Sequence, residues 1–482
     1  MEPNTHTLVL DIGKSNAKLV LFNAEGDVLT RRVQANAPVE AGGYTALGTD
    51  ALQAWLLDAM PTLPGRRQIG RIGITTHGAA FCALGDDGLA LPPMDYEWDG
   101  YGPWRERYAT LLDGFDITGS PLLPLGLNAG LQLYWLQQHR PEAWARVRHW
   151  LPYPQYWAWW LTGVAASEAT SLGCHTHLWQ PAHNRFAPWA VRQGLTERFA
   201  PLRLAHEVIG PLRPELAARL GLAPGCRVHV GLHDSNACLA RHLHAVPGAS
   251  VVSTGTWTVV MAPGVPTDAL TLDPLRDQLL NQSVEGQPVP TARFMGGREF
   301  AHLCHGADPS LATLRALRDV IAAGWMVLPE DCARPGAAHG RVAELRQGER
   351  RLGNRPGEVP LHLRPALGAW YCALMTAQTL RELLPGGGHH QDHTVVLEGP
   401  MAENPAFVTA LAALLAPLRL LRSVDEVEGT ARGAWLSTRW DEPAGEGARY
   451  AEVPLPEAAE VARLQAARGT WAAVVEGVAL HT

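Results

Sequence analysis

The sequence predicts an α/β protein built from two similar halves. Residues 7–22, T-L-V-L-D-I-G-K-S-N-A-K-L-V-L-F, read as strand, tight turn and strand, because a small polar segment separates two apolar runs. Residues 248–261 repeat this pattern around a G-T-W turn. Residues 227–240 and 394–415 each pass from an apolar strand through a turn into helical spacing. Such a partial duplication predicts two α/β domains, divided at residues 226/227, with a cleft between them.

Further elements follow the same alternation. Residues 47–60 carry apolar side chains at helical spacing, and residues 68–78 read as a buried strand that ends in a polar tip. Residues 81–91 are typical of a hairpin around D-D-G. Two proline- and arginine-rich segments, near 263–290 and 329–360, are expected to be surface insertions.

The composition limits the classes of function. The 482 residues are 46% hydrophobic and 18% charged, which is enough for two or three globular domains. A net charge of -7 argues against nucleic-acid or anionic-membrane partners. The first residues lack a signal-peptide pattern, and no apolar run is long enough to span a membrane. Seven scattered cysteines without a C-x-x-C pair favour reduced thiols and a cytoplasmic location.

The G-K-S of residues 13–15 is not a P-loop. A P-loop requires a glycine five positions before Gly13, where this chain has Leu8, and a helix after the turn, where this chain has a second apolar strand. An ordinary hairpin is the simplest alternative. A hairpin whose polar tip faces a phosphate is the other interpretation that the residues allow.

Five motifs in order resemble the FGGY carbohydrate kinases. They are D-I-G-K-S at 11–15, G-L-H-D-S-N-A at 231–237, S-T-G-T-W-T at 253–258, L-E-G-P-M-A-E-N-P at 397–405 and E-G-T-A-R-G-A-W at 428–435. The resemblance covers essentially the whole chain, and the S-T-G-T-W turn is most similar to the rhamnulokinase-type branch. It implies two actin-like (ribonuclease H-like) domains, each with a mixed central sheet flanked by helices, and a catalytic cleft between them. Residues 1–226 would mainly bind the sugar, and residues 227–482 would mainly bind the nucleotide.

Asp234 is the candidate catalytic base. It follows an apolar strand and precedes small residues, so its carboxylate can face a cleft. In the family motif the matching Asp activates the sugar hydroxyl. The structural alternative is that Asp234 caps the helix that follows it.

The resemblance also implies ATP and Mg²⁺ sites. Asp11 resembles the family Asp that organises Mg²⁺, often through water. Lys14 stands where the family usually has Thr, and its ammonium or backbone amide is expected beside the β- and γ-phosphates. The expected phosphate and nucleotide residues are Asp11, Gly13, Lys14, Ser15, Gly255, Thr256, Gly399, Ala402 and Asn404. Pro400, in place of a family glycine, removes one amide donor beside that last group.

For the sugar, T-T-H-G at residues 75–78 resembles the family strand end that contacts substrate hydroxyls. An aromatic side chain next to carboxylates, as in M-D-Y-E-W-D-G at 94–100, suits a molecule with apolar C–H faces and paired hydroxyls, although a packed loop is an equal alternative. The expected sugar residues are His77, Gly78, Asp95, Trp98, Asp99 and Asp234.

Two histidine clusters are interpreted without zinc. H-T-H at 175–177 lies in a stretch that resembles a family β-hairpin, and G-G-G-H-H-Q-D-H at 386–393 reads as a solvated loop. Neither has partner ligands at zinc-site spacing.

The leading hypothesis is an ATP- and Mg²⁺-dependent kinase of a small ketose such as L-rhamnulose. Xylulose, another pentulose or a glycerol-type polyol are the alternative substrates. A non-catalytic sugar sensor of the same fold is a further hypothesis, opposed by the retained Asp11 and Asp234. An acetate-kinase-like or chaperone-type ATPase is opposed by the sugar-facing first half. A homodimer is expected only by analogy with the family.

Overall fold

The computed structural model of the chain describes residues 5–330, 342–385, 393–424, 429–442 and 449–479. It divides into two compact units, which we describe one at a time. Unit 1 comprises Met1–Ala245, Leu280–Pro288 and Glu426–Gly447. Unit 2 comprises Val246–Leu279, Val289–Asp425 and Ala448–Thr482.

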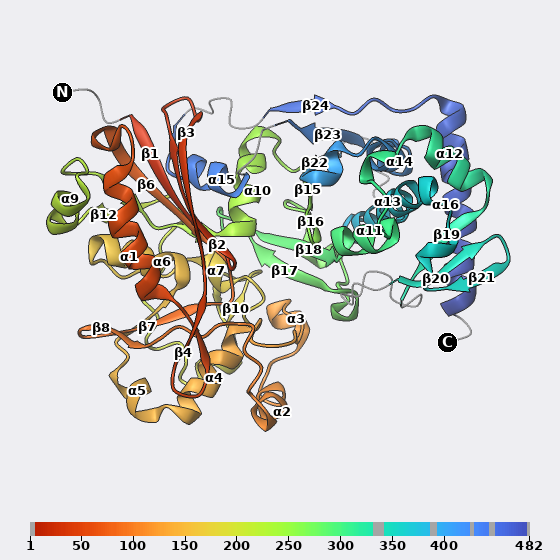
Figure 1. Cartoon of the computed structure of the whole chain (residues 1–482). Coiled ribbons are helices and arrows are strands. Elements are labelled where there is room, and N and C mark those ends of the chain that lie inside the picture. The colour runs from red at the N-terminus through yellow and green to blue at the C-terminus, as the bar shows by residue number, and fades with distance from the viewer. Residues whose placement is uncertain (1–4, 331–341, 386–392, 425–428, 443–448, 480–482) are drawn as a thin grey trace. The chain divides into compact units, whose positions relative to one another are not determined.

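Unit 1 is built on a mixed sheet with the strand order β12-β13-β6-β1-β2-β3, in which β14 also pairs with β6 (Figure 1). The predicted first hairpin is confirmed. β6, which lies next to β1 in the sheet, runs parallel to β1, β13 and β14. The strands are β1 His6–Ile12, β2 Asn16–Phe22, β3 Val28–Ala35, β6 Ile69–Thr76, β12 Val208–Pro211, β13 Arg227–His229 and β14 Leu232–His233. Because β13 belongs to this sheet, the expected division at residues 226/227 falls inside unit 1.

The other elements expected in the first half are confirmed. The helix expected at residues 47–60 is α1 (Thr49–Ala59), and the D-D-G hairpin is formed by β7 (Phe81–Gly85) and β8 (Gly88–Leu91). The tryptophan-rich segment contributes α4 (Ala129–His139) and α6 (Tyr153–Thr162).

The sheet of unit 2 repeats the topology of the first. Its strands β18, β16 and β15 form an antiparallel meander, β22 and β23 continue it in parallel, and β24 closes the edge antiparallel. The bounds are β15 Ser250–Thr254, β16 Thr258–Met261, β18 Pro288–Phe294, β22 Thr394–Glu398, β23 Arg419–Ser423 and β24 Tyr450–Glu452. The duplication that the hairpins predicted is therefore a duplication of sheet topology.

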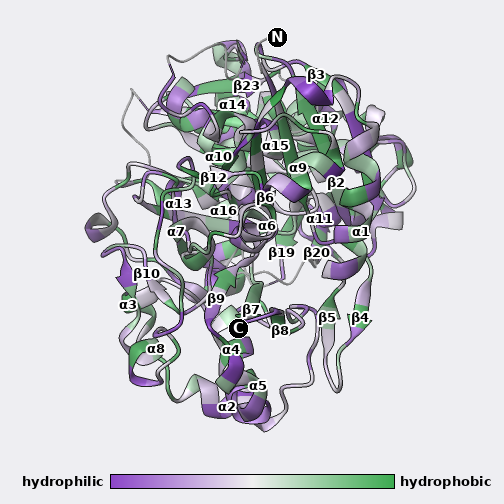
Figure 2. Cartoon of the chain, turned by 90° about the vertical axis from the view of Figure 1, so that its left-hand side faces the viewer, coloured by the Kyte–Doolittle hydropathy of each residue, from purple (hydrophilic) through white to green (hydrophobic). Residues whose placement is uncertain are grey.

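Buried apolar side chains cover both faces of the unit 1 sheet. Parallel strands with helices on their faces become almost continuously apolar, and β6 is buried at seven of its eight positions. Figure 2 shows hydrophobic residues along the central strands and hydrophilic residues on β3, whose side chains are mostly exposed. Trp150 and Trp157 have no exposed surface and belong to two different hydrophobic clusters of this unit.

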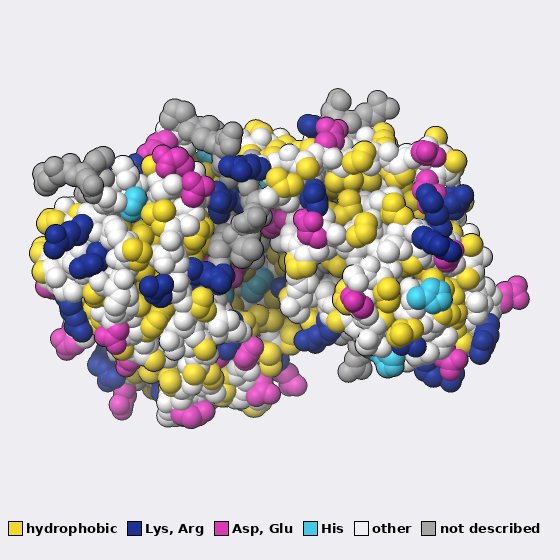
Figure 3. Space-filling view, turned by 45° about the horizontal axis from the view of Figure 1, so that its top comes forward, with side chains coloured by type: hydrophobic (Ala, Val, Ile, Leu, Met, Phe, Trp, Pro, Cys, Tyr) yellow, Lys and Arg dark blue, Asp and Glu magenta, His cyan; other side chains and the backbone are white. Residues whose placement is uncertain are grey.

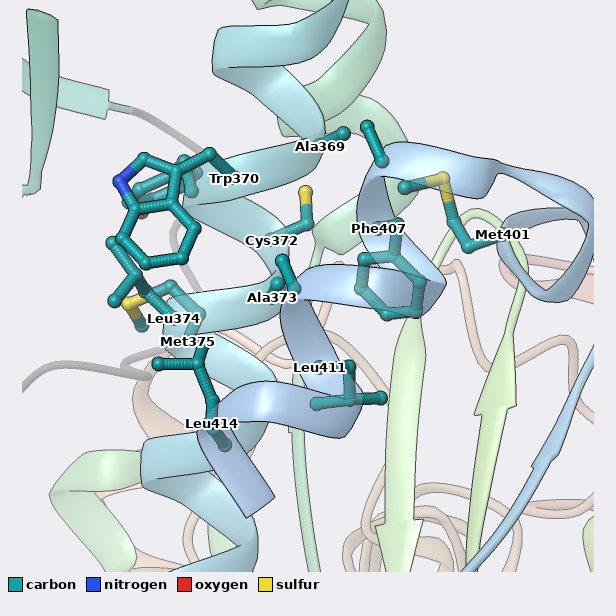
Figure 4. Packing of buried hydrophobic residues seen from close by; sticks show 14 of the residues in the cluster. Ala369, Trp370, Cys372, Ala373, Leu374, Met375, Met401, Phe407, Leu411 and Leu414 are labelled. Carbon is teal, nitrogen blue, oxygen red and sulfur yellow. The ribbon is translucent and has the colours of Figure 1, made fainter. Parts of the chain in front are cut away.

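Unit 2 is centred on a long buried helix, α13 (Arg364–Leu383), which packs against α14 (Pro405–Leu415). Figure 4 shows buried side chains of both helices, among them Ala373 and Met375 of α13 and Phe407 and Leu411 of α14, in one hydrophobic cluster. α16 (Ala458–Ala479) adds Leu464, Trp471 and Val475 to the same cluster. Burial of this apolar surface is the main favourable free energy of the unit.

The two segments expected to be surface insertions contain ordered strands. The first contributes β17 (Gln278–Gln282), which is buried throughout and within which the chain passes from unit 2 to unit 1. The second contributes β20 (Val342–Gln347) and β21 (Arg350–Gly353), which form a small sheet with β19 (Trp325–Pro329). The expectation was wrong for β17, whose side chains are buried, whereas β21 is mostly exposed, as a surface insertion would be.

The surface shows no concentration of one charge in Figure 3, where Lys and Arg side chains are interspersed with Asp and Glu. Within the part of the chain that the structure describes, none of the helices combines the length and apolar character that a membrane span requires.

Helices α10 (Asp234–Ala245) and α15 (Gly429–Ser437) of unit 1 approach closely at Gly433. A Cβ atom at Gly433 would lie 1.7 Å from the carbonyl oxygen of Ala237, so only glycine fits this crossing. The crossing holds the helix that begins at Asp234.

We predict that Gly433→Ala destabilises the protein by about 1–3 kcal/mol, because the two helix backbones must separate. The matched control is Gly469→Ala in α16, where an added Cβ meets nothing within 4 Å and higher helix propensity should stabilise by up to about 1 kcal/mol. Urea unfolding followed by circular dichroism measures both midpoints. Equal midpoints for the two variants would contradict the close contact.

Candidate active site

Three polar residues stand where neighbouring strands of unit 1 end. Asp11 lies near the end of β1, His77 directly follows β6, and Asp234 directly follows β14. Thr75 of β6 is in register with Asp11 on one side and with Leu232 of β14 on the other. Because all three strands are parallel, their carboxyl ends meet at one edge, where ligands of α/β proteins bind. The sequence predicted each residue separately, and the sheet brings them to one edge.

The carboxylate of Asp234 is held by two neighbours and keeps about a third of its surface exposed. Its Oδ1 accepts a hydrogen bond from the backbone N–H of Ser235 at 2.6 Å and lies 3.0 Å from Nε2 of His233. Burial raises the pKa of Asp234, but the charge and hydrogen bond of His233, together with the charge of His77 and the backbone N–H of Ser235, lower it below the ordinary value. Asp234 is therefore ionised at neutral pH.

His233 connects Asp234 to a buried thiol that the sequence analysis did not single out. The same Nε2 atom lies 3.4 Å from Sγ of Cys174, and Nδ1 lies 3.2 Å from Nδ2 of Asn236. Burial lowers the pKa of His233, yet Cys174 and Asp234 together raise it well above its ordinary value. Burial likewise raises the pKa of the Cys174 thiol, but His175 and His233 bring it down to about 5. The cluster thus places an imidazolium between two acidic groups.

The buried carboxylate of Glu168 is linked through Thr170 to the end of β14. Glu168 begins helix α7 (Ala169–Leu172) and accepts hydrogen bonds from the backbone and hydroxyl of Thr170, at 2.9 and 2.6 Å. The same hydroxyl oxygen accepts a hydrogen bond from the backbone N–H of His233. Burial raises the pKa of Glu168 to about 7. No sequence motif marks Glu168 for this role, because Ser, Thr, Asp and Asn, rather than Glu, are the preferred N-cap residues.

His77 and Asp95, both expected to contact sugar, lie in one group with Lys14. His77 is buried, and its backbone N–H donates to the carbonyl of Ile12. Its Nδ1 lies 2.9 Å from the carbonyl oxygen of Gly78, so Nδ1 carries the proton and Nε2 is left as an acceptor. Burial lowers the pKa of His77, while Asp234 and Asp95 act to raise it. Asp95 is almost fully buried.

The other two expected sugar residues are placed differently. The Trp98 indole packs edge-on against Tyr101 and Trp135, at centroid distances of 4.7 and 4.9 Å. Asp99 is exposed. Trp98 thus contributes to an aromatic cluster, which is the packed-loop alternative that the sequence left open. Gly78 lies beside His233, since a Cβ there would be 2.8 Å from its Nε2.

The tip of the first hairpin presents Gly13, Lys14 and Ser15. Its turn is closed by the Gly13 N–H, which donates to the carbonyl of Asn16, and by Nδ2 of Asn36, which donates to the carbonyl of Gly13. Asp11 is buried, and one of its oxygens lies 3.5 Å from Nζ of Lys18 in the facing strand. The side chain of Lys14 extends to Asp95, with Nζ 2.5 Å from Oδ2.

In unit 2, Gly255 and Thr256 form the exposed tip of the corresponding hairpin, between β15 and β16. Nearby, the hydroxyl of Thr254 donates to the carbonyl of Glu398 at 2.6 Å and accepts from the N–H of Met401. Gly399 has φ +85°, and a Cβ there would lie 1.9 Å from the carbonyl oxygen of Thr254. The second hairpin and the G-P-M-A turn are therefore joined in one unit.

Ala402 and Asn404 occupy the start of α14 in unit 2. Ala402 is buried, and Oδ1 of Asn404 accepts a hydrogen bond from the backbone N–H of Phe407 at 3.0 Å. Asn404 therefore caps the helix. Pro400 begins the short 3-10 helix η9 (Pro400–Glu403), a position where its missing N–H costs nothing.

Of the two histidine clusters, His175 and His177 lie between α7 and β10 (Trp179–Gln180) and hydrogen-bond to Leu127, Ser120 and Tyr108. The second cluster lies outside the described residues except for His393, which contacts Ser250. Among the residues that the structure describes, no group of three or more His, Cys, Asp or Glu has a metal-holding arrangement.

Comparison with known proteins agrees with this architecture. Residues 113–240 match the N-terminal domain of the FGGY family of carbohydrate kinases, and residues 247–446 match the FGGY C-terminal domain. A carbohydrate kinase of known structure from Novosphingobium aromaticivorans is 35% identical with a TM-score of 0.86, and the match covers 98% of this chain and 99% of that one.

Two named relatives extend the comparison. The L-fuculokinase of Escherichia coli O157:H7 is 26% identical over 453 residues, covering 89% of this chain and 91% of that protein. A xylulose kinase of Staphylococcus epidermidis (strain ATCC 12228 / FDA PCI 1200) is 30% identical over 168 residues, covering 34% and 30%.

Fold, sequence family and solved relative together define a phosphotransferase that uses an alcohol group as acceptor. The chain belongs to the FGGY family of carbohydrate kinases, which confirms the resemblance and the fold class derived from the sequence.

We predict that Cys174→Ala lowers the imidazole pKa of His233, because the thiol beside Nε2 acts to raise it. Histidine-selective isotope labelling and an NMR titration measure this change. Cys304→Ala, which removes a buried thiol from unit 2, is the matched control and should leave the His233 titration unchanged. An unaltered His233 pKa in Cys174→Ala would show that the thiol and imidazole do not interact.

Proposed function

We propose that this chain transfers the γ-phosphate of ATP, with Mg²⁺, to a hydroxyl of a small ketose. The observation that carries the proposal is the ionised carboxylate of Asp234 at the strand edge that also presents Asp11 and His77, in a chain of the FGGY family. Unit 1 supplies the sugar side, and unit 2 supplies much of the nucleotide side.

Asp234 acts as the base that accepts the hydroxyl proton. Its lowered pKa makes it a weak base, which suits a loose transition state, where positioning and charge stabilisation contribute most of the catalysis. His233 fixes the orientation of the carboxylate through Oδ1, and Oδ2 is the oxygen that we assign to the hydroxyl. The neutral His77 offers Nε2 as an acceptor to a neighbouring hydroxyl.

The hairpin tips bind the phosphates in this proposal. Gly13, Lys14 and Ser15 contribute backbone amides and a hydroxyl, and Gly255 and Thr256 contribute the corresponding groups of unit 2. The Gly399–Ala402 turn meets the adenosine with its backbone. Asn404 supports that turn as a helix cap, because its side-chain oxygen already accepts from Phe407.

Asp11 fits a Mg²⁺ site. Magnesium in phosphoryl-transfer sites takes one or two carboxylates together with water and phosphate oxygens, and Asp11 is a single carboxylate at the strand edge beside the hairpin tip. When bound, the metal neutralises charge on the phosphates. Lys18 compensates the buried Asp11 carboxylate.

For the acceptor we favour a 6-deoxyketose, L-rhamnulose or L-fuculose. The match to an L-fuculokinase covers 89% of this chain, and the S-T-G-T-W turn is similar to the rhamnulokinase-type branch. Tyr153 and Tyr96 border His77, at centroid distances of 5.2 and 5.6 Å, and offer apolar ring surface to C–H groups. Xylulose is the second candidate, supported by the partial match to a xylulose kinase.

An assay of ADP release over ketoses and polyols tests the proposal. We expect sugar-dependent turnover, highest with a 6-deoxyketose. Turnover that does not depend on sugar, or none with any sugar, would contradict it. The second outcome would favour the non-catalytic sensor.

We predict that Asp234→Asn lowers kcat by about 10²–10⁴-fold, the usual contribution of a general base, and leaves ADP binding unchanged. Turnover assays and calorimetry measure the two quantities. Asp86→Asn removes a carboxylate from an exposed ion pair with Arg148 and serves as the control, with wild-type turnover expected. A wild-type rate in Asp234→Asn would refute the assignment of the base.

We predict that His233→Gln moves the acidic limb of the kcat/KM profile to higher pH. The pKa of Asp234 is raised by burial and lowered by His233, so loss of the imidazole removes a lowering effect and Asp234 takes up its proton at a higher pH. A pH–rate profile measures the shift. A limb that stays in place or moves to lower pH would exclude His233 as the group that holds Asp234 ionised.

A further inference from the structure

Lys14 belongs to the first hairpin tip, but its ammonium is held by carboxylates of another segment. Nζ lies 2.5 Å from Oδ2 of Asp95 and 3.1 Å from Oε2 of Glu97. The Lys14 side chain is 18% exposed, and that of Asp95 is 2% exposed. Both partners sit in the loop that follows the β7–β8 hairpin, and Asp95 is 81 residues from Lys14 in sequence.

The charge of this group does not suit a phosphate site. The ammonium of Lys14 and the carboxylates of Asp95 and Glu97 together carry a formal charge of -1. The ammonium is in direct contact with Asp95. At such distances the attraction between ammonium and carboxylate is strong, and a polyanion approaching the ammonium also meets the two carboxylates. The group suits a neutral ligand that both donates and accepts hydrogen bonds.

A buried ion pair also needs a reason to be present. Two charges taken from water gain little net stability, and apolar residues of similar volume often serve as well. Loss of one partner, in contrast, is costly because the other charge stays buried and unpaired. A role in ligand recognition accounts for a pair that stability alone does not require.

The group also lies beside the sugar-side residues. The ammonium is 5.5 Å from the ring centroid of Tyr96, and that ring meets His77 edge-on at 5.6 Å. The charges of Lys14, Asp95 and Asp234 all act on the pKa of His77, after the larger effect of burial. Lys14 therefore acts on the same imidazole as the candidate base.

A cavity adjoins this group. It has a volume of about 170 Å³, and Lys14, His77, Asp95 and Tyr153 are among its lining residues, whereas Asp234 is not. A single water molecule needs roughly 10–15 Å³ by the same measure, so the cavity can admit part of a small ligand such as a sugar. Lys14 and Asp95 thus border a space that Asp234 does not line.

We propose that Lys14 is a sugar-specificity residue, which with Asp95 binds two adjacent hydroxyls at the end of the ketose remote from Asp234. The ammonium has three N–H donors, of which Asp95 and Glu97 take two, so one is left for a hydroxyl oxygen. Asp95 accepts from the neighbouring hydroxyl. Its Oδ1 also accepts from the backbone N–H of Glu97, which fixes the carboxylate.

The proposal rests on the proposed function and narrows its substrate class. A neutral sugar with two adjacent hydroxyls is favoured. A sugar acid is disfavoured, because its carboxylate would approach Asp95 and Glu97. An analogue that lacks one of the two hydroxyls leaves a buried polar group unpaired and is rejected strongly. In this proposal the Lys14 ammonium binds the sugar, whereas the backbone amides of the hairpin tip bind the phosphates.

Lys14→Met tests the proposal, since Met preserves much of the length and removes the charge. We predict that the Kd and KM for the sugar rise roughly 10- to 100-fold, the value of one or two charge-assisted hydrogen bonds, with the ADP Kd and ATP KM within twofold of wild type. Arg148→Met, which breaks the exposed pair with Asp86 in the same unit, is the matched control and should change neither.

A double-mutant cycle compares Lys14→Met, Asp95→Asn and the double variant Lys14→Met/Asp95→Asn with the wild type. If the two residues bind the sugar together, the losses in sugar affinity are less than additive. The double variant also leaves no unpaired buried charge, so sugar binding can be measured on it if Lys14→Met alone does not fold. Calorimetry measures sugar and ADP binding separately even where turnover is lost.

Two outcomes would overturn the inference. Weaker ATP and ADP binding with an unchanged sugar Kd would return Lys14 to the phosphate site. Unchanged binding of both ligands would make the ion pair structural. Failure of the proposed function is a different result, because it shows as the absence of sugar-dependent turnover in the wild-type protein.

Discussion

The parallel alignment of β1, β6 and β14 is the constraint on which the rest of the acceptor side depends. Strands that run parallel end at one edge, so residues from three distant parts of the chain, Asp11, His77 and Asp234, come together without any direct link between them. The continuous apolar burial of β6 fixes this alignment, because a register shift would expose its side chains. The crossing of α10 and α15 then holds the helix that starts at Asp234.

Electrostatics at that edge are set by burial and by a few short contacts. His233 is positioned by the Glu168–Thr170 network and in turn lowers the pKa of Asp234, so the carboxylate is ionised although partly buried. His77, held neutral by burial, lies where Asp234 and the Lys14–Asp95 pair both act on it. This arrangement has several hydrogen-bond acceptors and one ammonium that is already paired with carboxylates. It therefore suits a neutral sugar better than an anionic ligand.

The duplication of sheet topology explains why the two hairpins look alike in sequence. In each unit the hairpin tip follows a strand that pairs in parallel with another strand of the same sheet. These pairs are β1 with β6 in unit 1 and β15 with β22 in unit 2. In unit 2 the tip is joined to the Gly399 turn through Thr254, which accounts for the small residues at both places. Pro400 is compatible with this arrangement because it begins a short helix.

The sequence by itself determined the fold class, the two hairpins, most of the strands and helices tested, and the family, because these depend on local periodicity, turn residues and motif order. It also supplied Asp234, Asp11 and His77 as candidates. Only the tertiary structure decided that β13 belongs to unit 1, that Asn404 caps a helix, that Trp98 packs in an aromatic cluster, and that Cys174 meets His233. Lys14 shows the reason most clearly: its place in the chain is the phosphate-like turn, but its ammonium is paired with Asp95, 81 residues away. Contacts at such separation follow from packing and burial, which no local pattern records.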